Sequence, residues 1–255
     1  MKLYKYYSFN QNSISSLLNE FCWYSDPRTF NDPFDTNIIE TNFLQEAKQA
    51  KILCLSSYND SLLMWSHYAN SHKGFCVEFT DYSDNELLEL KQRKIFPIDS
   101  ENSRLAIIRN AKPVKYMTTE EIEEFISNMP TDDNQFLDHY RGLTEEDKNI
   151  LCDKIDNSLF IKHKDWEYES EYRIINNHYN TVCFPGKITA VYFGMAMSQI
   201  DKRAITKYLN ASPSMSQCNL FQMYRKKGTY SLTSRPFNLQ NDCKDLNLSF
   251  AENLN

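Results

Sequence analysis

Two short segments of the chain gather residue types that could bind or transform a ligand. The first runs from Trp65 to Gly74, reads WSHYANSHKG, and leads into the apolar stretch FCVEF. Aromatic faces can stack on a flat heterocycle while imidazole nitrogens fix its orientation. We therefore expect a ligand-binding turn that uses four side chains: Trp65, His67, Tyr68 and His72. The alternative is that Trp65 and Tyr68 are core residues and that His67 caps a backbone carbonyl.

The second segment, Trp166 to Arg173, reads WEYESEYR and alternates acidic with other residues. If it is extended, the two-residue period of a strand puts Glu167, Glu169 and Glu171 on the same face as Arg173. Neighbouring like charges repel each other unless water or a cation screens them. The segment is then either a solvated strand face or a site where Arg173 and the hydroxyls or positive charge of a ligand fill the space.

A third candidate is the turn sequence FNDPFD at residues 30–35. Asn and Asp side chains bond to nearby backbone in turns, and a proline pushes the preceding Asp32 out of helical backbone geometry. We favour this structural interpretation. The alternative is that Asp32 and Asp35 present carboxylates to a ligand or an ion.

Several familiar chemistries lack their sequence motifs. His67 and His72 are spaced so that they share neither a helix face nor a strand face, and no Cys-x-x-Cys pair exists, so we find no metal motif. The chain also lacks the G-x-S-x-G, G-x-G-x-x-G and P-loop patterns. A metal nuclease would favour Glu-x-Lys, whereas Glu171 is followed by Tyr172 and Arg173, and arginine cannot act as an adjustable proton shuttle.

Composition narrows the class of protein further. A net charge of −6 argues against non-specific coating of DNA, which needs a field of Lys and Arg. The hydrophobic fraction of 41% and the aromatic fraction of 14% suffice for a packed core. Seven scattered cysteines are typical of a reducing compartment. With no apolar stretch long enough for a signal peptide or a membrane span, we expect a soluble cytoplasmic protein without a membrane partner.

Helix caps and apolar runs in the sequence predict the helices and strands that must position these residues. Hydroxyl or amide caps, most with an acid three residues on, predict six helices near residues 12–21, 41–51, 83–93, 118–129, 144–160 and 198–209. Runs rich in β-branched and aromatic residues predict strands at 2–7, 52–58, 74–79, 113–116, 171–176, 188–193 and 220–224. We predict an α/β (α+β) fold with a mixed sheet wrapped by about six helices, in one domain over 1–210 with a C-terminal strand and peripheral extension over 211–255.

The same residues carry a resemblance to a known family. FNDPFD at 30–35, LCLSSYND at 53–60, LMWSHYANSHKGFCVEF at 63–79 and WEYESEYRI at 166–174 resemble the domain-of-unknown-function family 2971 (DUF2971), with a weaker likeness in AVYFGMAMS at 190–198. The likeness spans residues 1 to 209. It implies a relation to abortive-infection proteins and a role in conflict with phage.

The layout also looks like the ADP-ribosyltransferase superfold. That likeness implies that Tyr68 or Trp65 stacks on nicotinamide, and that Glu171 or Glu169 hydrogen-bonds the ribose and steadies the charge of a breaking glycosidic bond. The first strand offers Lys5 where the superfold has His or Arg, and lysine lacks the fork of an arginine.

We therefore expect a cytosolic effector of a phage-defence or toxin-like system that acts on NAD or a nucleotide. Glu169, Glu171 and His67 would be catalytic, with Arg173 for positioning or phosphate contact, and NAD would be a substrate. This expectation requires the two segments to face each other across one cleft. One alternative is a metal-dependent nuclease that uses Asp32, Asp35 and Glu171. The other is a non-enzymatic sensor whose WSHYANSHKG turn recognises a phage or host protein or a second subunit.

Overall fold

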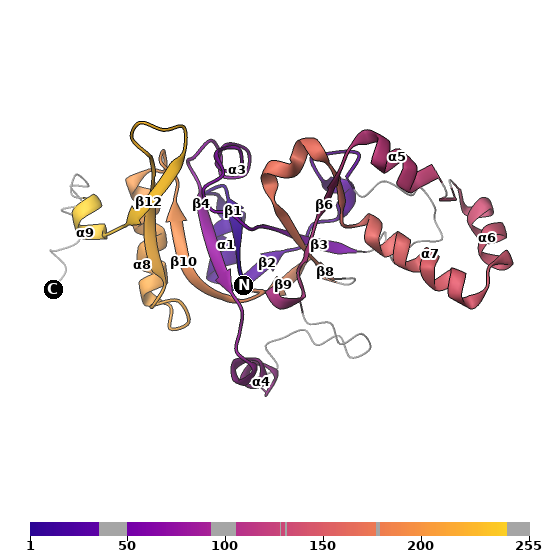
Figure 1. The fold of residues 1–255 in the computed structure, drawn as a ribbon. Helices are drawn as coiled ribbons and strands as arrows, with labels where there is room; N and C mark the ends of the chain where they lie inside the picture. Colours follow the sequence, from indigo (N-terminus) through magenta and orange to yellow (C-terminus); the bar gives the residue numbers. More distant parts are fainter. Residues whose placement is uncertain (36–49, 93–105, 128, 131, 177–178, 244–255) are drawn as a thin grey trace. The chain divides into compact units, whose positions relative to one another are not determined.

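A computed structural model describes residues 1–35, 50–92, 106–127, 129–130, 132–176 and 179–243 (Figure 1). The chain forms two compact units, each assembled from segments that are separated in sequence. Unit 1 consists of Met1–Glu20, Tyr58–Asp81 and Gly186–Asn255. Unit 2 consists of Phe21–Ser57 and Tyr82–Pro185.

Unit 1 is built on five strands in the order β12-β11-β10-β4-β1. Their bounds are β1 (Lys2–Tyr7), β4 (Phe75–Thr80), β10 (Lys187–Phe193), β11 (Asn219–Arg225) and β12 (Leu232–Pro236). Strand β4 pairs antiparallel with both β1 and β10, whereas β11 runs parallel to β10 and antiparallel to β12. The sheet is therefore mixed, and the segment after residue 210 supplies two of its strands.

The described helices of unit 1 begin at side-chain caps. They are α1 (Gln11–Leu18), α3 (Leu62–His67), α8 (Gln199–Ala211) and α9 (Leu239–Asp242), capped by Asn10, Ser61, Ser198 and Asn238. Helices α1 and α8 meet where the hydroxyl of Tyr208 donates to the carbonyl of Leu17 at 3.0 Å. Their buried positions, Leu17 and Leu209, join the apolar strand residues in the core.

Unit 2 contains the strands β3 (Lys51–Ser56), β8 (Glu171–Asn176) and β5 (Lys112–Pro113), with β8 antiparallel to both neighbours. Two further strand pairs are short. β2 (Phe21–Trp23) is antiparallel to β9 (Thr181–Cys183), and β6 (Lys115–Met117) is parallel to β7 (Ile161–His163).

The α-helices of unit 2 in the described ranges are α4 (Asp84–Gln92), α5 (Thr119–Ser127), α6 (Asp133–Gly142) and α7 (Glu145–Ser158). Met129, Phe136, Leu151 and Ile155 form a small buried cluster of their own. The unit also has 3-10 helices at Pro27–Thr29, Ile108–Asn110 and Lys164–Glu169. Within the described ranges, every helix is too short or too polar to cross a bilayer.

The predicted mixed α/β class is confirmed, and most of its elements lie where their caps and apolar runs placed them. The helix α3, the helix α6 and the strands β2, β7, β9 and β12 were not predicted. Three of the predicted elements also differ. The helix expected over 41–51 falls on residues 41–49, which lie outside the described ones, and its expected end is wrong because Lys51 begins β3. The strand expected at 113–116 is divided between β5 and β6. Helix α1 ends at Leu18 rather than near Phe21, because Glu20 is left-handed with φ of 55° and Phe21 begins β2.

Candidate functional site

The first chemistry-bearing segment is a helix followed by a strained turn. The prediction that the whole segment is a turn is therefore wrong. Trp65 and His67 belong to α3, capped by the hydroxyl of Ser61. Trp65 is fully buried, its indole N–H donates to the carbonyl of Asn59 at 2.7 Å, and its ring meets the Tyr6 ring edge-on at 5.3 Å. Trp65 is therefore a core residue of unit 1.

The turn itself holds three successive left-handed residues, Asn70, Ser71 and His72, with φ of 47°, 54° and 65°. Such backbone is unfavourable for residues with a side chain unless the surroundings fix it. Here the amide of His72 donates to the carbonyl of Trp65 at 3.0 Å, and the carbonyl of His72 accepts from the amide of Ala196 at 3.0 Å. The backbone of this turn is thus held on both sides.

The side chains of the turn differ in how accessible they are. The His72 ring lies parallel to Trp65 with 6.2 Å between centroids, and its Nδ1 is buried with no hydrogen-bond partner among the described residues. Burial lowers the pKa of His72, so its imidazole is neutral near pH 7. His67 is exposed and Tyr68 half-buried. In strand β1 the Lys5 ammonium lies 5.7 Å from the centroid of the Tyr7 ring.

The second segment is not extended throughout, so its three glutamates do not share one strand face; only the part from Glu171 on is a strand, as predicted over 171–176. Glu167 and Glu169 lie on the 3-10 helix Lys164–Glu169, whose first turn is capped by His163 through the amide of Asp165 at 3.3 Å. Ser170 is left-handed, with φ of 43°, and β8 begins only at Glu171. The solvated-face interpretation also fails for Glu169 and Glu171, since both are buried and only Glu167 is exposed.

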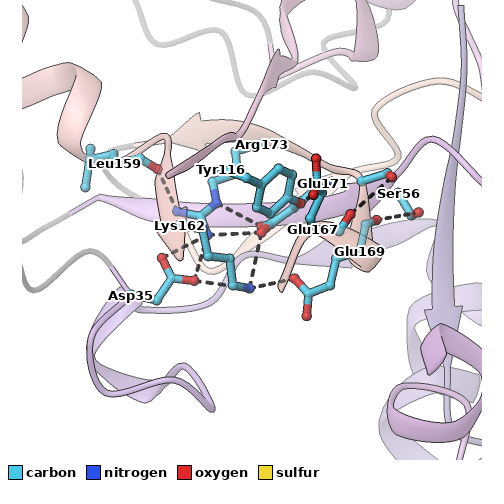
Figure 2. Close-up of polar contacts among 10 residues, drawn as sticks. Asp35, Ser56, Tyr116, Leu159, Lys162, Glu167, Glu169, Glu171 and Arg173 are labelled. Atoms are coloured by element: carbon cyan, nitrogen blue, oxygen red, sulfur yellow. Dashed lines mark hydrogen bonds and ion pairs between the residues drawn. The ribbon is translucent and has the colours of Figure 1, made fainter. Parts of the chain in front are cut away.

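The change of direction at Ser170 brings Glu169 and Glu171 together around one lysine, as Figure 2 shows. The Lys162 ammonium donates to Glu169 Oε2 at 2.6 Å and to Glu171 Oε2 at 3.4 Å. It also lies 3.3 Å from Asp35 Oδ2. We call this set the Lys162 cluster, and it comprises Asp35, Lys162, Glu169, Glu171 and Arg173. All five side chains are buried and all belong to unit 2.

Arg173 is the fixed centre of the Lys162 cluster. Its Nε donates to Glu171 Oε1 at 2.8 Å and its Nη2 to Glu171 Oε2 at 3.0 Å. The same Nη2 lies 2.7 Å from Asp35 Oδ2, and Nη1 donates to the carbonyl of Leu159 at 2.7 Å. All three guanidinium nitrogens therefore contact protein oxygens, and the side chain positions two carboxylates that are far apart in sequence.

The charges of the cluster shift one another's pKa. Burial alone would raise the pKa of Glu171, but the charges of Arg173 and Lys162 outweigh it, so that the pKa is lowered. For Asp35, burial raises the pKa and the same two cations offset only part of the effect. Burial would lower the pKa of Lys162, yet the carboxylates of Glu171, Glu169 and Asp35 raise it. Glu171 is therefore ionised and Lys162 protonated at neutral pH.

Backbone contacts fix both glutamates from two sides. The hydroxyl of Ser56 in β3 donates to the carbonyl of Glu169 at 2.7 Å. The amide of Glu171 donates to the hydroxyl oxygen of Tyr116 at 2.8 Å, in β6. Because Ser56 also pairs with Glu171 in the β3–β8 register, Glu171 begins a paired strand and Glu169 is held directly before it.

The two aspartates of FNDPFD have different roles in the structure. Asp32 Oδ1 accepts from the amide of Phe34 at 2.9 Å, which is the turn role. Asp35 instead reaches the Lys162 cluster. Nowhere in the described ranges do three or more His, Cys, Asp or Glu residues form a group that could hold a metal ion.

Sequence reasoning missed Lys162, Trp166 and Tyr168 as site residues. The Lys162 ammonium lies 4.8 Å from the centroid of the Trp166 ring, and that ring is 6.0 Å from Tyr168. Both aromatic rings are half-buried and share the 3-10 helix with Glu169. A signal for Lys162 was its place next to the apolar residues Phe160 and Ile161, where an unpaired ammonium would be costly.

The two chemistry-bearing segments belong to different units. Trp65, His67, Tyr68 and His72 are in unit 1, whereas the Lys162 cluster is in unit 2. Their meeting across one cleft stays a prediction.

Comparison with known families adds one finding. The stretch that holds both segments matches a family model whose description is 'protein of unknown function'. Residues 64–174 match DUF2971. The DUF2971 match covers a little under half of the chain and includes every member of the Lys162 cluster except Asp35. No curated protein and no solved structure matches the chain.

Proposed function

We propose that this protein is a cytosolic effector of a phage-defence or toxin-like system that acts on NAD or a nucleotide, by ADP-ribosyl transfer or by hydrolysis of the glycosidic bond. The observation that carries the chemical part is the Lys162 cluster, in which Glu169 lies 2.6 Å from an ammonium that an indole ring covers. The defence part rests on the family resemblance, and the cytosolic location on the scattered cysteines.

Breaking an N-glycosidic bond builds positive charge on the ribose, which a fixed carboxylate stabilises without having to reorganise. We assign that role to Glu169, because it ends the short 3-10 helix that also carries Trp166 and Tyr168. Glu171, with both oxygens bonded to Arg173, is the positioning residue behind it. A flat base or nicotinamide ring would stack on the half-buried aromatic pair.

The proposal also assigns roles to residues of unit 1. His67 is exposed and Tyr68 is half-buried, and we assign these two side chains to ligand orientation there. Trp65 and His72, whose rings lie parallel with 6.2 Å between centroids, would support the turn. Lys5 and Asp32 have the weaker claim to ligand contact. The Lys5 ammonium lies beside the Tyr7 ring, and Asp32 accepts a hydrogen bond within its own turn.

The test is incubation of the purified full chain with NAD and, side by side, with labelled nucleic acid. We expect release of nicotinamide, reduced by about 10²-fold or more in Glu169→Gln. No turnover of NAD or of the nucleic acid, with the chain folded, would overturn the proposal. Tight binding of a protein partner without any turnover, unaffected by Glu171→Gln, would instead support a non-enzymatic sensor.

A metal-dependent nuclease is the second candidate, although in the described ranges Asp35 and Glu171 belong to no group of three or more His, Cys, Asp or Glu residues that could hold a metal ion. One observation favours it. Asp35 and Glu171, far apart in sequence, share contacts with Arg173 and Lys162, so the ammonium that Glu-Tyr-Arg lacks is supplied by another strand. This candidate predicts that nucleic-acid cleavage needs Mg²⁺ or Mn²⁺, stops on chelation, and is lost in Asp35→Asn. Cleavage that persists with a chelator would rule it out.

A further inference from the structure

A further buried acid, Glu78 in unit 1, forms a polar site that the proposed function does not use. Glu78 lies in β4, flanked by β1 and β10, with 3% of its surface exposed. A carboxylate inside a sheet is rare unless it is paired and hydrogen-bonded. Its surroundings therefore indicate what the site is built to hold.

Three neutral hydroxyls fix the Glu78 carboxylate. Tyr4 and Tyr192 both donate to Oε2, at 3.1 Å and 3.0 Å, and Thr189 donates to Oε1 at 2.8 Å. Thr189 reaches Oε1 because a β-bulge between Ile188 and Ala190 shifts the register of β10 against β4. Bulges commonly redirect one side chain beside functional sites.

The fourth donor differs in kind from the other three. The Lys2 ammonium donates to Oε1 at 2.9 Å, yet the Lys2 side chain is 60% exposed while that of Glu78 is 4% exposed. An exposed lysine gains little net free energy from such a pair, because holding its long side chain costs rotamer entropy. Lys2 is thus a replaceable partner of a carboxylate that is otherwise rigidly held.

We propose that Glu78 is the recognition carboxylate of a binding site for the primary ammonium group of a small-molecule amine, and that Lys2 occupies this site until the amine displaces it. The site takes an ammonium rather than a guanidinium. A guanidinium fork needs both carboxylate oxygens, and Oε2 is already engaged by two phenols. The existing contact to Oε1 is a single-point contact at the end of an alkyl stem.

The test uses n-butylammonium chloride, which reproduces the end of a lysine side chain, on the full chain at low ionic strength. In the wild type, Lys2 competes as a tethered ligand with a high effective concentration. We expect Lys2→Met to bind butylammonium about tenfold more tightly than the wild type in calorimetric titration. Lys207→Met, an exposed change of equal charge in unit 1, should bind like the wild type.

Two comparisons guard against a general charge effect. Tetramethylammonium has the same charge but no N–H donor, so Lys2→Met should discriminate against it. The double variant Lys2→Met, Glu78→Gln should lose the gained affinity. Equal affinity of the wild type and Lys2→Met for butylammonium, or equal binding of the two cations by Lys2→Met, would overturn the proposal even if the double variant fails to fold.

Discussion

At the scale of single residues, Arg173 determines whether the Lys162 cluster can exist. It is fully buried and binds Glu171 and Asp35 at once. Replacing one partner of a buried ion pair leaves the other charges uncompensated, which usually costs about 3–5 kcal/mol. We predict that Arg173→Met lowers the free energy of unfolding in urea by that amount, whereas Arg141→Met, at an exposed arginine, changes it little. Equal stability of the two variants would contradict the cluster.

The lowered pKa of Glu171 makes a prediction about acid stability. Because folding lowers this pKa below its ordinary value of 4.5, the stabilisation is present above that pH and is lost as the pH falls below it. Glu171→Gln should therefore lose stability less steeply with acid than the wild type in urea titrations at successive pH values. Glu167→Gln, at an exposed acid of the same segment, should keep the wild-type slope. A wild-type slope in Glu171→Gln would contradict the assignment.

At the scale of elements, the left-handed turn before β4 depends on a glycine from another segment. A Cβ at Gly194 would collide with the backbone carbonyl of His72, whereas a Cβ at Gly142 would meet nothing within 4 Å. We predict that Gly194→Ala lowers the Tm, by about 2–4 °C for each kcal/mol of strain. Gly142→Ala should leave the Tm unchanged or raise it. A Tm for Gly194→Ala equal to that of Gly142→Ala would show that the turn is not constrained.

Elements with a local signature could be predicted from the sequence, and those shaped by distant contacts could not. Thr144 with Asp147 and Ser198 with Asp201 placed the starts of α7 and α8 correctly, because a cap acts within one turn. The 3-10 helix at the start of the acidic segment was missed because the alternation of residue types there has the two-residue period of a strand. What bends the segment is the left-handed Ser170 and the bond from Ser56, 113 positions away.

The candidate site shows the same limit. Glu169, Glu171 and Arg173 stood out by their spacing, and Asp35 by its turn. The apolar residues before Lys162 signalled that it is buried, but nothing local showed that its partners are Asp35, Glu169 and Glu171. Pairing between distant strands is set by the whole fold, not by the residues on either side.

At the scale of the whole molecule, the matched family region does not correspond to a compact unit. Residues 64–174 take parts of both units and leave out β1 and β10, which flank β4, as well as Asp35. We predict that a 64–174 fragment does not fold cooperatively, because β4 loses both neighbouring strands and the buried Lys162 and Arg173 lose Asp35. Circular dichroism on heating should show a cooperative transition for the full chain and none for the fragment. A sharp transition in the fragment would contradict the division into units.

The most direct measurement of the central claim is the rate of nicotinamide release from NAD by three proteins: wild type, Glu169→Gln and Glu167→Gln. The two variants remove the same charge two positions apart, one inside the Lys162 cluster and one on the surface. The account predicts that Glu167→Gln keeps the wild-type rate and that Glu169→Gln falls by about 10²-fold or more while staying folded. Equal rates for the two variants, or no release by the wild type, would contradict it.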